Sequence, residues 1–115
     1  MTLYKSGDVV LLPFPFTNLT TTKQRPAVII STESFHARQL DVIVLAVTSH
    51  VPPSLNPEDH LLNPSDQRAA GLPKPSIVKC AKLLTIDRRL IRKTLGHLSS
   101  ETLHQLKQRL LAVLA

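Results

Sequence analysis

A few basic and hydroxyl side chains in this sequence could together bind and cleave a phosphodiester. They are Arg25, Thr48, Ser49, Lys79 and Lys82. Cleaving RNA without a metal ion needs a base for the 2′-hydroxyl, a cation for the charge that develops on the phosphate and an acid for the leaving 5′-oxygen. Because the 2′-hydroxyl takes part, such a site would act on RNA only.

Arg25 is the most informative of these residues because it directly precedes Pro26, which opens an apolar stretch. Proline fixes its own φ and biases the preceding residue toward extended backbone, so we expect Arg25 at the mouth of a strand. A guanidinium stays charged and offers phosphate a planar fork of donors. The alternative is an arginine that closes a turn or pairs with a nearby carboxylate.

Thr48 and Ser49 directly follow the most hydrophobic stretch, 40–47, and the two lysines lie on a later apolar stretch around Cys80. Strand ends in a small barrel can converge on one groove, where these groups would meet Arg25. The alternative for Thr48-Ser49 is a turn in which the hydroxyls satisfy backbone groups at a strand end.

Other chemistries have less support. The histidines are isolated from one another and no second cysteine accompanies them, so we expect no metal site. The three glycines of the chain cannot build a glycine-rich phosphate loop, and a serine-nucleophile elbow is missing. Cys80 lies within an apolar strand and is expected to be an inert core thiol.

The composition is that of a basic globular protein. The net charge of +6 and the isoelectric point near 10 suit an acidic partner, such as nucleic acid, an anionic membrane face or an acidic protein segment, although a merely soluble basic surface is the alternative. One tyrosine and three phenylalanines are too few for a base-stacking platform. The lone cysteine excludes an internal disulfide. No apolar run approaches the roughly 20 residues of a membrane helix, and no signal-peptide pattern is present, so we expect a cytoplasmic protein.

Short strands would have to position the candidate residues. Apolar runs bounded by glycine or proline predict strands at 9–12, 26–31, 40–47, 76–84 and 90–98, with a shorter candidate at 59–63. Residues 34–38 are predicted to be a connector, 64–75 a loop and 85–87 a turn. Residues 17–24 hold four threonines and no apolar periodicity, which predicts a loop. Phe14 and Phe16 alternate with prolines and are expected to close the barrel rim, or alternatively to face a ligand.

The last residues differ in kind. Ser99 can cap a helix whose first turn contains Glu101, and an apolar stripe follows at helical spacing. The stripe comprises Leu103, Leu106, Leu110, Val113 and Leu114. The whole pattern predicts a mainly β fold in one domain, 1–115, with a small, partly open β-barrel at about 5–98 and a C-terminal α-helix at about 99–114.

Seven short segments, in this order, resemble the MazF/PemK family of toxin endoribonucleases from bacterial toxin–antitoxin systems. The segments are Gly7-Asp8-Val9-Val10-Leu11, Arg25-Pro26 with Ala27-Val28-Ile29-Ile30, Val47-Thr48-Ser49, Gly71-Leu72, Ser76-Ile77-Val78-Lys79-Cys80, Thr85-Ile86-Asp87 and Leu95-Gly96-His97-Leu98-Ser99. The resemblance implies an SH3-like barrel, usually a homodimer. It also implies cleavage of single-stranded RNA at short sequences without metal or other cofactor, leaving a 2′,3′-cyclic phosphate and a 5′-hydroxyl.

The resemblance also implies roles for individual residues. Arg25 would stabilise charge on the phosphate and could act as the acid, and Thr48 would position or polarise the scissile phosphate. Residues 17–24 would cover the bound RNA, and an acidic antitoxin would lie across the same groove. The implied RNA-binding residues are Phe16, Thr17, Lys23, Gln24, Ser49, Lys79 and Lys82.

The chain departs from the family in the segment around Cys80 and again at Gly96-His97. The PemK-like branch carries arginine, cysteine and a catalytic aspartate where this sequence has Lys79-Cys80-Ala81. Ala81 cannot serve as a base, and Gly96-His97 stands where an arginine is common. The base could come from elsewhere, with His50 as a candidate; Arg25 and Thr48 could suffice; or catalysis could be lost while binding remains.

Two functions follow from these expectations. The first is a sequence-selective endoribonuclease toxin neutralised by an acidic antitoxin. The second is a catalytically silent barrel that holds RNA or the antitoxin. A third function, an adaptor for proline-rich peptides, needs an aromatic-lined groove that this composition does not favour.

Overall fold

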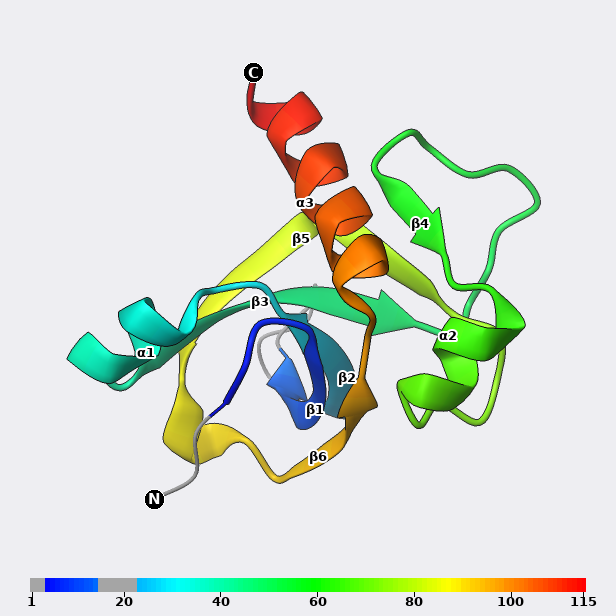
Figure 1. Ribbon diagram of the computed structural model, residues 1–115. Coiled ribbons are helices and arrows are strands. Elements are labelled where there is room, and N and C mark those ends of the chain that lie inside the picture. Colours follow the sequence, from blue (N-terminus) through cyan, green and yellow to red (C-terminus); the bar gives the residue numbers. More distant parts are fainter. Residues whose placement is uncertain (1–3, 15–22) are drawn as a thin grey trace.

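A computed structural model of the protein describes residues 4–14 and 23–115 (Figure 1). Within these ranges the chain forms six strands, three α-helices and one short 3-10 helix. In chain order they are β1 (Asp8–Phe14), β2 (Lys23–Ile29), α1 (Glu33–Arg38), β3 (Asp41–Thr48), β4 (Asp59–Leu61), α2 (Pro64–Ala69), β5 (Ile77–Asp87), η1 (Arg88–Leu90), β6 (Lys93–His97) and α3 (Ser100–Leu114).

The strands form one antiparallel sheet in the order β4-β5-β3-β2-β1-β6, and the sheet does not close on itself. The long α3 packs against β5 beside β4, while α1 and α2 lie at opposite ends of β3 (Figure 1). The prediction of a mainly β, partly open fold with a C-terminal helix is confirmed.

The core has two halves, one on each face of the sheet. One half contains Val9, Val28 and Val47 together with Leu98 and Leu106, so this is the half that α3 covers. The other is built from the alternating residues of the same strands, with Val10, Ala27 and Val44 among them. Strands buried on both faces read as continuous apolar runs, which is why the sequence pattern located them.

Helix α3 begins as predicted, because the Ser99 side chain accepts a hydrogen bond from the backbone N–H of Thr102. Leu106 is fully buried and Leu110 packs against the same core. The predicted stripe is wrong at its end, since Val113 and Leu114 are 48% and 71% exposed. The apolar face therefore extends past the sheet that it covers.

Three predicted irregular segments are regular. Residues 34–38 form most of α1, capped by Thr32, and half of the predicted loop 64–75 forms α2. Asn63 caps α2 by accepting from the N–H of Asp66, and Pro64 occupies the first turn, where it needs no donor. The predicted turn 85–87 is the end of β5, which pairs with β3 as far as Asp87. Conversely, the predicted strand 90–98 is shortened to β6 by η1.

The segment after α2 is fixed by a close approach to β6. A Cβ on Gly96 would collide with the carbonyl oxygen of Ala69, and a Cβ on Gly71 would collide with that of Leu95. Gly71 also has a positive φ of 72°, which favours glycine. Residues 71–76 are thereby held against the sheet near the end of β3.

Cys80 is fully buried in the core half that α3 covers, as predicted. Burial raises the pKa of its thiol to about 11. The thiolate needed for nucleophilic attack is therefore scarce at neutral pH. In the part of the chain that the structure describes, no helix is long and apolar enough to cross a membrane.

Candidate functional site

Strand register brings Arg25, Thr48 and Lys79 to one face of the sheet. Ala27 of β2 pairs with Ala46 of β3, and Ala46 in turn pairs with Lys79 of β5. In antiparallel strands, the residue two before Ala27 lies across from the residue two after Ala46, and alternate residues share a face. Arg25 and Thr48 are therefore neighbours, with Lys79 on the next strand.

The surface is hollowed at this point. One hollow of about 560 Å³ is lined by Arg25, Val47, Thr48, Ser49, His50, Pro52, Lys79 and Lys82. A second, of about 530 Å³, shares Arg25, Val47, Thr48 and Ser49 and continues along residues 71–76 toward Lys93 of β6. We call the two hollows together the cleft. Its described charged side chains are all cationic.

Arg25 lies within β2, not at the mouth of a strand as predicted, because β2 already begins at Lys23. It is opposite Leu12 of β1, and Pro26 is opposite Leu11. The Arg25 side chain is partly buried, and its Nε atom is shielded from solvent. The guanidinium therefore extends from within a strand that pairs with β1 at this position, and not from a loop.

Thr48 is the last residue of β3. Two uses of its hydroxyl were predicted, a contact to phosphate and a hydrogen bond within a strand-end turn, and the two are compatible. Its Oγ1 accepts a hydrogen bond from the backbone N–H of His50 at 3.1 Å, which is the expected strand-end turn. A hydroxyl also has a proton to donate. Thr48 can thus hold the turn and still donate to a phosphate oxygen in the cleft.

Lys79 has a counterion. Its Nζ lies 3.2 Å from Oδ1 of Asp59, its register partner on β4, whose side chain is only 1% exposed. Asp59 also accepts from the backbone N–H of Asn56 through Oδ2. Lys79 is therefore a fixed cation whose charge is partly balanced by the protein itself.

Lys82 lines the cleft because β5 contains a bulge at this point. Between Leu45 and Ala46 of β3, the partner on β5 changes from Leu83 to Lys79, which leaves residues 80–82 as an insertion. A bulge breaks the alternation and re-aims side chains. Here it buries Cys80 and exposes Ala81 and Lys82.

The structure thus brings together Arg25, Thr48, Ser49, Lys79 and Lys82. It does not bring Lys23 and Gln24 into the lining of either hollow; both are exposed on β2, so the predicted loop 17–24 is wrong for these two residues. Phe16, Thr17 and the rest of that loop lie outside the described residues, as does the Phe14 side chain.

Sequence reasoning missed Lys74 and Lys93 and gave His50 only a minor place. Lys74 and Lys93 line the second hollow because α2 and β6 meet at Gly71 and Gly96. No local signal marks this contact, since β6 pairs with β1 from the other end of the chain. His50 could have been found from its position two residues after Thr48.

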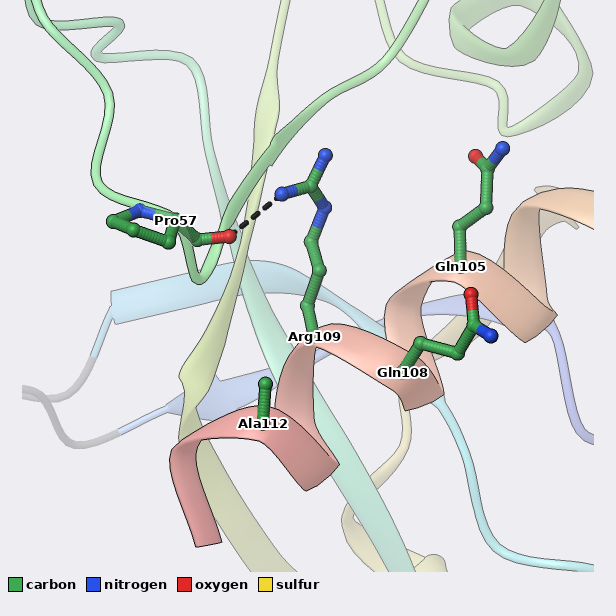
Figure 2. Close-up of a pocket in the computed structure, with 5 residues that line it drawn as sticks. All are labelled: Pro57, Gln105, Gln108, Arg109 and Ala112. Carbon is green, nitrogen blue, oxygen red and sulfur yellow. Dashed lines mark hydrogen bonds between the residues drawn. The ribbon is translucent and has the colours of Figure 1, made fainter. Parts of the chain in front are cut away.

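A third hollow, of about 400 Å³, lies on the side of α3 (Figure 2). Figure 2 shows Arg109 extending from α3 to the carbonyl oxygen of Pro57, 2.6 Å from its guanidinium. Arg109 also donates to Nδ1 of His60 at 3.1 Å. Burial, and secondly the charge of Arg109, lower the pKa of His60, while Asp66 acts in the opposite direction. Among the described residues, no three His, Cys, Asp or Glu side chains are grouped to hold a metal ion.

A sequence model of the PemK-like, MazF-like toxins of type II toxin–antitoxin systems matches residues 5–114. The chain belongs to this family. Its fold agrees with that of solved PemK/MazF-like toxins, as the resemblance implied.

Among solved structures, MazF from Deinococcus radiodurans is 21% identical with a TM-score of 0.77, covering 99% of this chain and 98% of that one. The MazE–MazF complex of the same organism is 19% identical with a TM-score of 0.77, covering 98% and 97%. An endoribonuclease from a mycobacterial species is 19% identical with a TM-score of 0.76, covering 99% and 93%. No curated protein matches the chain.

Proposed function

We propose that this protein is the toxin of a toxin–antitoxin system and cleaves single-stranded RNA at selected sequences without a metal ion. The observation that carries the proposal is the cleft, in which Arg25 and Thr48 lie on neighbouring strands with Lys79 and Lys82 beside them. Membership of the PemK/MazF-like toxin family supports it. So does the fold shared with a mycobacterial protein that is named an endoribonuclease.

The roles follow from the chemistry of each group. Arg25 stabilises the charge that develops on the phosphate. Because a guanidinium does not deprotonate in proteins, it acts as a positively charged hydrogen-bond donor and not as the acid. Thr48 donates to a phosphate oxygen and Ser49 lies beside it at the open end of β3. Lys82 and the fixed Lys79 attract the neighbouring phosphates. The product is a 2′,3′-cyclic phosphate with a 5′-hydroxyl.

The proposed protein partners are a second copy of this chain and an acidic antitoxin. A fold relative was solved in complex with its cognate antitoxin, and another as a MazE–MazF complex. The net charge of +6 and the cationic cleft suit an acidic segment as well as RNA. An antitoxin laid across the cleft would exclude RNA by competing for the same cations.

A catalytically silent RNA-binding or antitoxin-binding barrel is the second candidate function. Ala81 favours it, since this exposed position on the β5 bulge lacks the carboxylate of the PemK-like branch. The two functions share a ligand and differ only in whether the RNA backbone is cut.

The deciding experiment incubates the purified protein with a long RNA of mixed sequence in the presence of a chelator. We expect discrete fragments ending in cyclic phosphates. Arg25→Ala should lower the cleavage rate by roughly 10²–10³-fold, the usual cost of losing one charge-stabilising donor, while circular dichroism shows an unchanged fold. RNA retained without cleavage would establish the silent barrel, and cleavage by Arg25→Ala at the wild-type rate would remove Arg25 from the site.

A further inference from the structure

We propose that His50 is the general base that takes the proton from the attacking 2′-hydroxyl. The inference rests on the proposed ribonuclease function and names the group that replaces the carboxylate missing at Ala81. It starts from a requirement of the reaction, because a 2′-hydroxyl is a poor nucleophile until its proton has an acceptor.

Elimination among the residues of the cleft leads to His50. In the described lining of both hollows there is no aspartate or glutamate, and the arginine and lysines are protonated and cannot accept. His50 carries the one imidazole in that lining, and a neutral imidazole has a ring nitrogen that can accept a proton. Residues 15–22, outside the described ranges, contain only proline, phenylalanine, threonine, asparagine and leucine. That segment has no base to offer either.

The position of His50 fits the role. Its backbone N–H is bonded to the Thr48 hydroxyl at 3.1 Å, so the turn that places Thr48 also places His50. The His50 side chain is exposed and lies on the wall of the hollow that contains Arg25. The charged residues that line this hollow with His50 are Arg25, Lys79 and Lys82, and behind Lys79 lies its partner Asp59, which is not part of the lining.

The proposed reaction proceeds by proton transfer and phosphoryl transfer. The 2′-O–H bond breaks and its proton moves to an imidazole nitrogen of His50, while the 2′-oxygen forms a bond to phosphorus. Arg25 stabilises the charge of the pentavalent phosphate. The bond between phosphorus and the 5′-oxygen then breaks, its electron pair leaves with that oxygen, and solvent water supplies the proton. Imidazolium returns its proton to solvent before the next turnover.

The test compares His50→Gln with wild type in a chelator, measuring kcat and KM on a defined RNA from pH 5.5 to 8.5. Glutamine keeps the size and the backbone contact but is no base. We expect kcat to fall by roughly 10²–10⁴-fold, the usual contribution of general acid–base catalysis, with KM changed by less than threefold. The fall of the wild-type rate on the acidic side should vanish in the variant. Added imidazole should partly rescue His50→Ala.

His104→Gln is the matched control, since His104 is an exposed histidine on α3, outside the cleft lining. It should retain the wild-type rate and pH profile. If wild type cleaves and His50→Gln matches it at every pH, the base assignment is overturned and the ribonuclease function stands. If wild type itself does not cleave, the proposed function fails and this inference fails with it.

Discussion

The protein uses an arginine with a histidine in two different settings. At α3, Arg109 donates to Nδ1 of His60 and to the carbonyl oxygen of Pro57, and His60 is buried. In the cleft, Arg25 lies within the sheet near His50, whose exposed side chain lines a hollow of about 560 Å³. Arg109 also lines a hollow, of about 400 Å³, but its guanidinium is bonded across to the segment that contains β4. Arg25 and His50 line a larger hollow in which Lys79 and Lys82 add two more cations.

Residue type alone therefore does not mark a functional site. Arg109 donates hydrogen bonds to His60 and to a backbone carbonyl, so these polar groups are already paired within the protein and stabilise the fold. The cleft gathers cations on one face, and a surface that concentrates one sign of charge favours an anionic ligand. If the two settings really differ in this way, substitutions in one should change stability and substitutions in the other should change activity.

The strongest effect on stability is expected from Arg109→Ala. The change removes both bonds of the guanidinium and leaves Nδ1 of His60 and the carbonyl oxygen of Pro57 to find water, at a cost of about 1–2 kcal/mol. The measurement is the urea midpoint followed by circular dichroism. Arg25→Ala is the matched variant. Its urea midpoint should shift far less than that of Arg109→Ala, although its cleavage rate should fall.

RNA cleavage by the same two variants completes this test. Arg109→Ala should cleave at the wild-type rate at temperatures where it is folded, because α3 lies outside the cleft lining. Loss of cleavage in folded Arg109→Ala would show that the two settings are coupled and that the division into a structural and a functional pair is wrong.

The sequence predicted most of the polar residues that line the first hollow, because several of them carry local signals. The Arg25-Pro26 step and the hydroxyls after the apolar run 40–47 could be read directly, and the strand pattern implied that they meet. The caps of α1 and α2 were also present in the sequence, as Thr32 and as Asn63-Pro64, but the short helices that follow have no apolar periodicity to draw attention.

The features of the cleft that could not be predicted from the sequence depend on pairing between segments that are distant in the chain. Asp59 neutralises Lys79 only because β4 pairs with β5 in one particular register. Lys82 faces the cleft only because residues 80–82 are a bulge; a regular strand would alternate through them. Such contacts are set by tertiary register, and no spacing within either segment predicts them.

The two lysines of the cleft offer a smaller, quantitative test. Binding of a 2′-deoxy oligonucleotide, which cannot be cleaved by 2′-hydroxyl attack, should be measured against salt concentration. Lys82→Gln should reduce the slope of log K against log salt by about 0.7, the value for one phosphate contact on a single strand. Lys79→Gln should reduce the slope by less than this one-contact value, because Asp59 already balances the charge of Lys79.

Lys107→Gln controls for net charge, since Lys107 lies on α3, away from the cleft lining. Its slope should match the wild type. Equal slopes for all three variants would mean that the protein attracts nucleic acid through its overall charge and not through the cleft.

The smallest expected effect is a dependence of stability on pH that arises at His60. Burial and the charge of Arg109 lower the pKa of His60 in the folded protein below its ordinary value of 6.5. As the pH falls through 6.5, the unfolded chain therefore takes up a proton before the folded chain does, and folding becomes weaker. Asp87, whose pKa is lowered to about 2 by Arg89, stays ionised in both states above pH 5.5 and does not contribute to this slope.

Urea midpoints between pH 7.5 and 5.5 should consequently fall more steeply for wild type than for His60→Gln, in which the amide oxygen can still accept from Arg109. A His60→Gln slope equal to that of wild type would show that the buried histidine does not titrate with folding. The contrast between the two histidines would then rest on their activities alone.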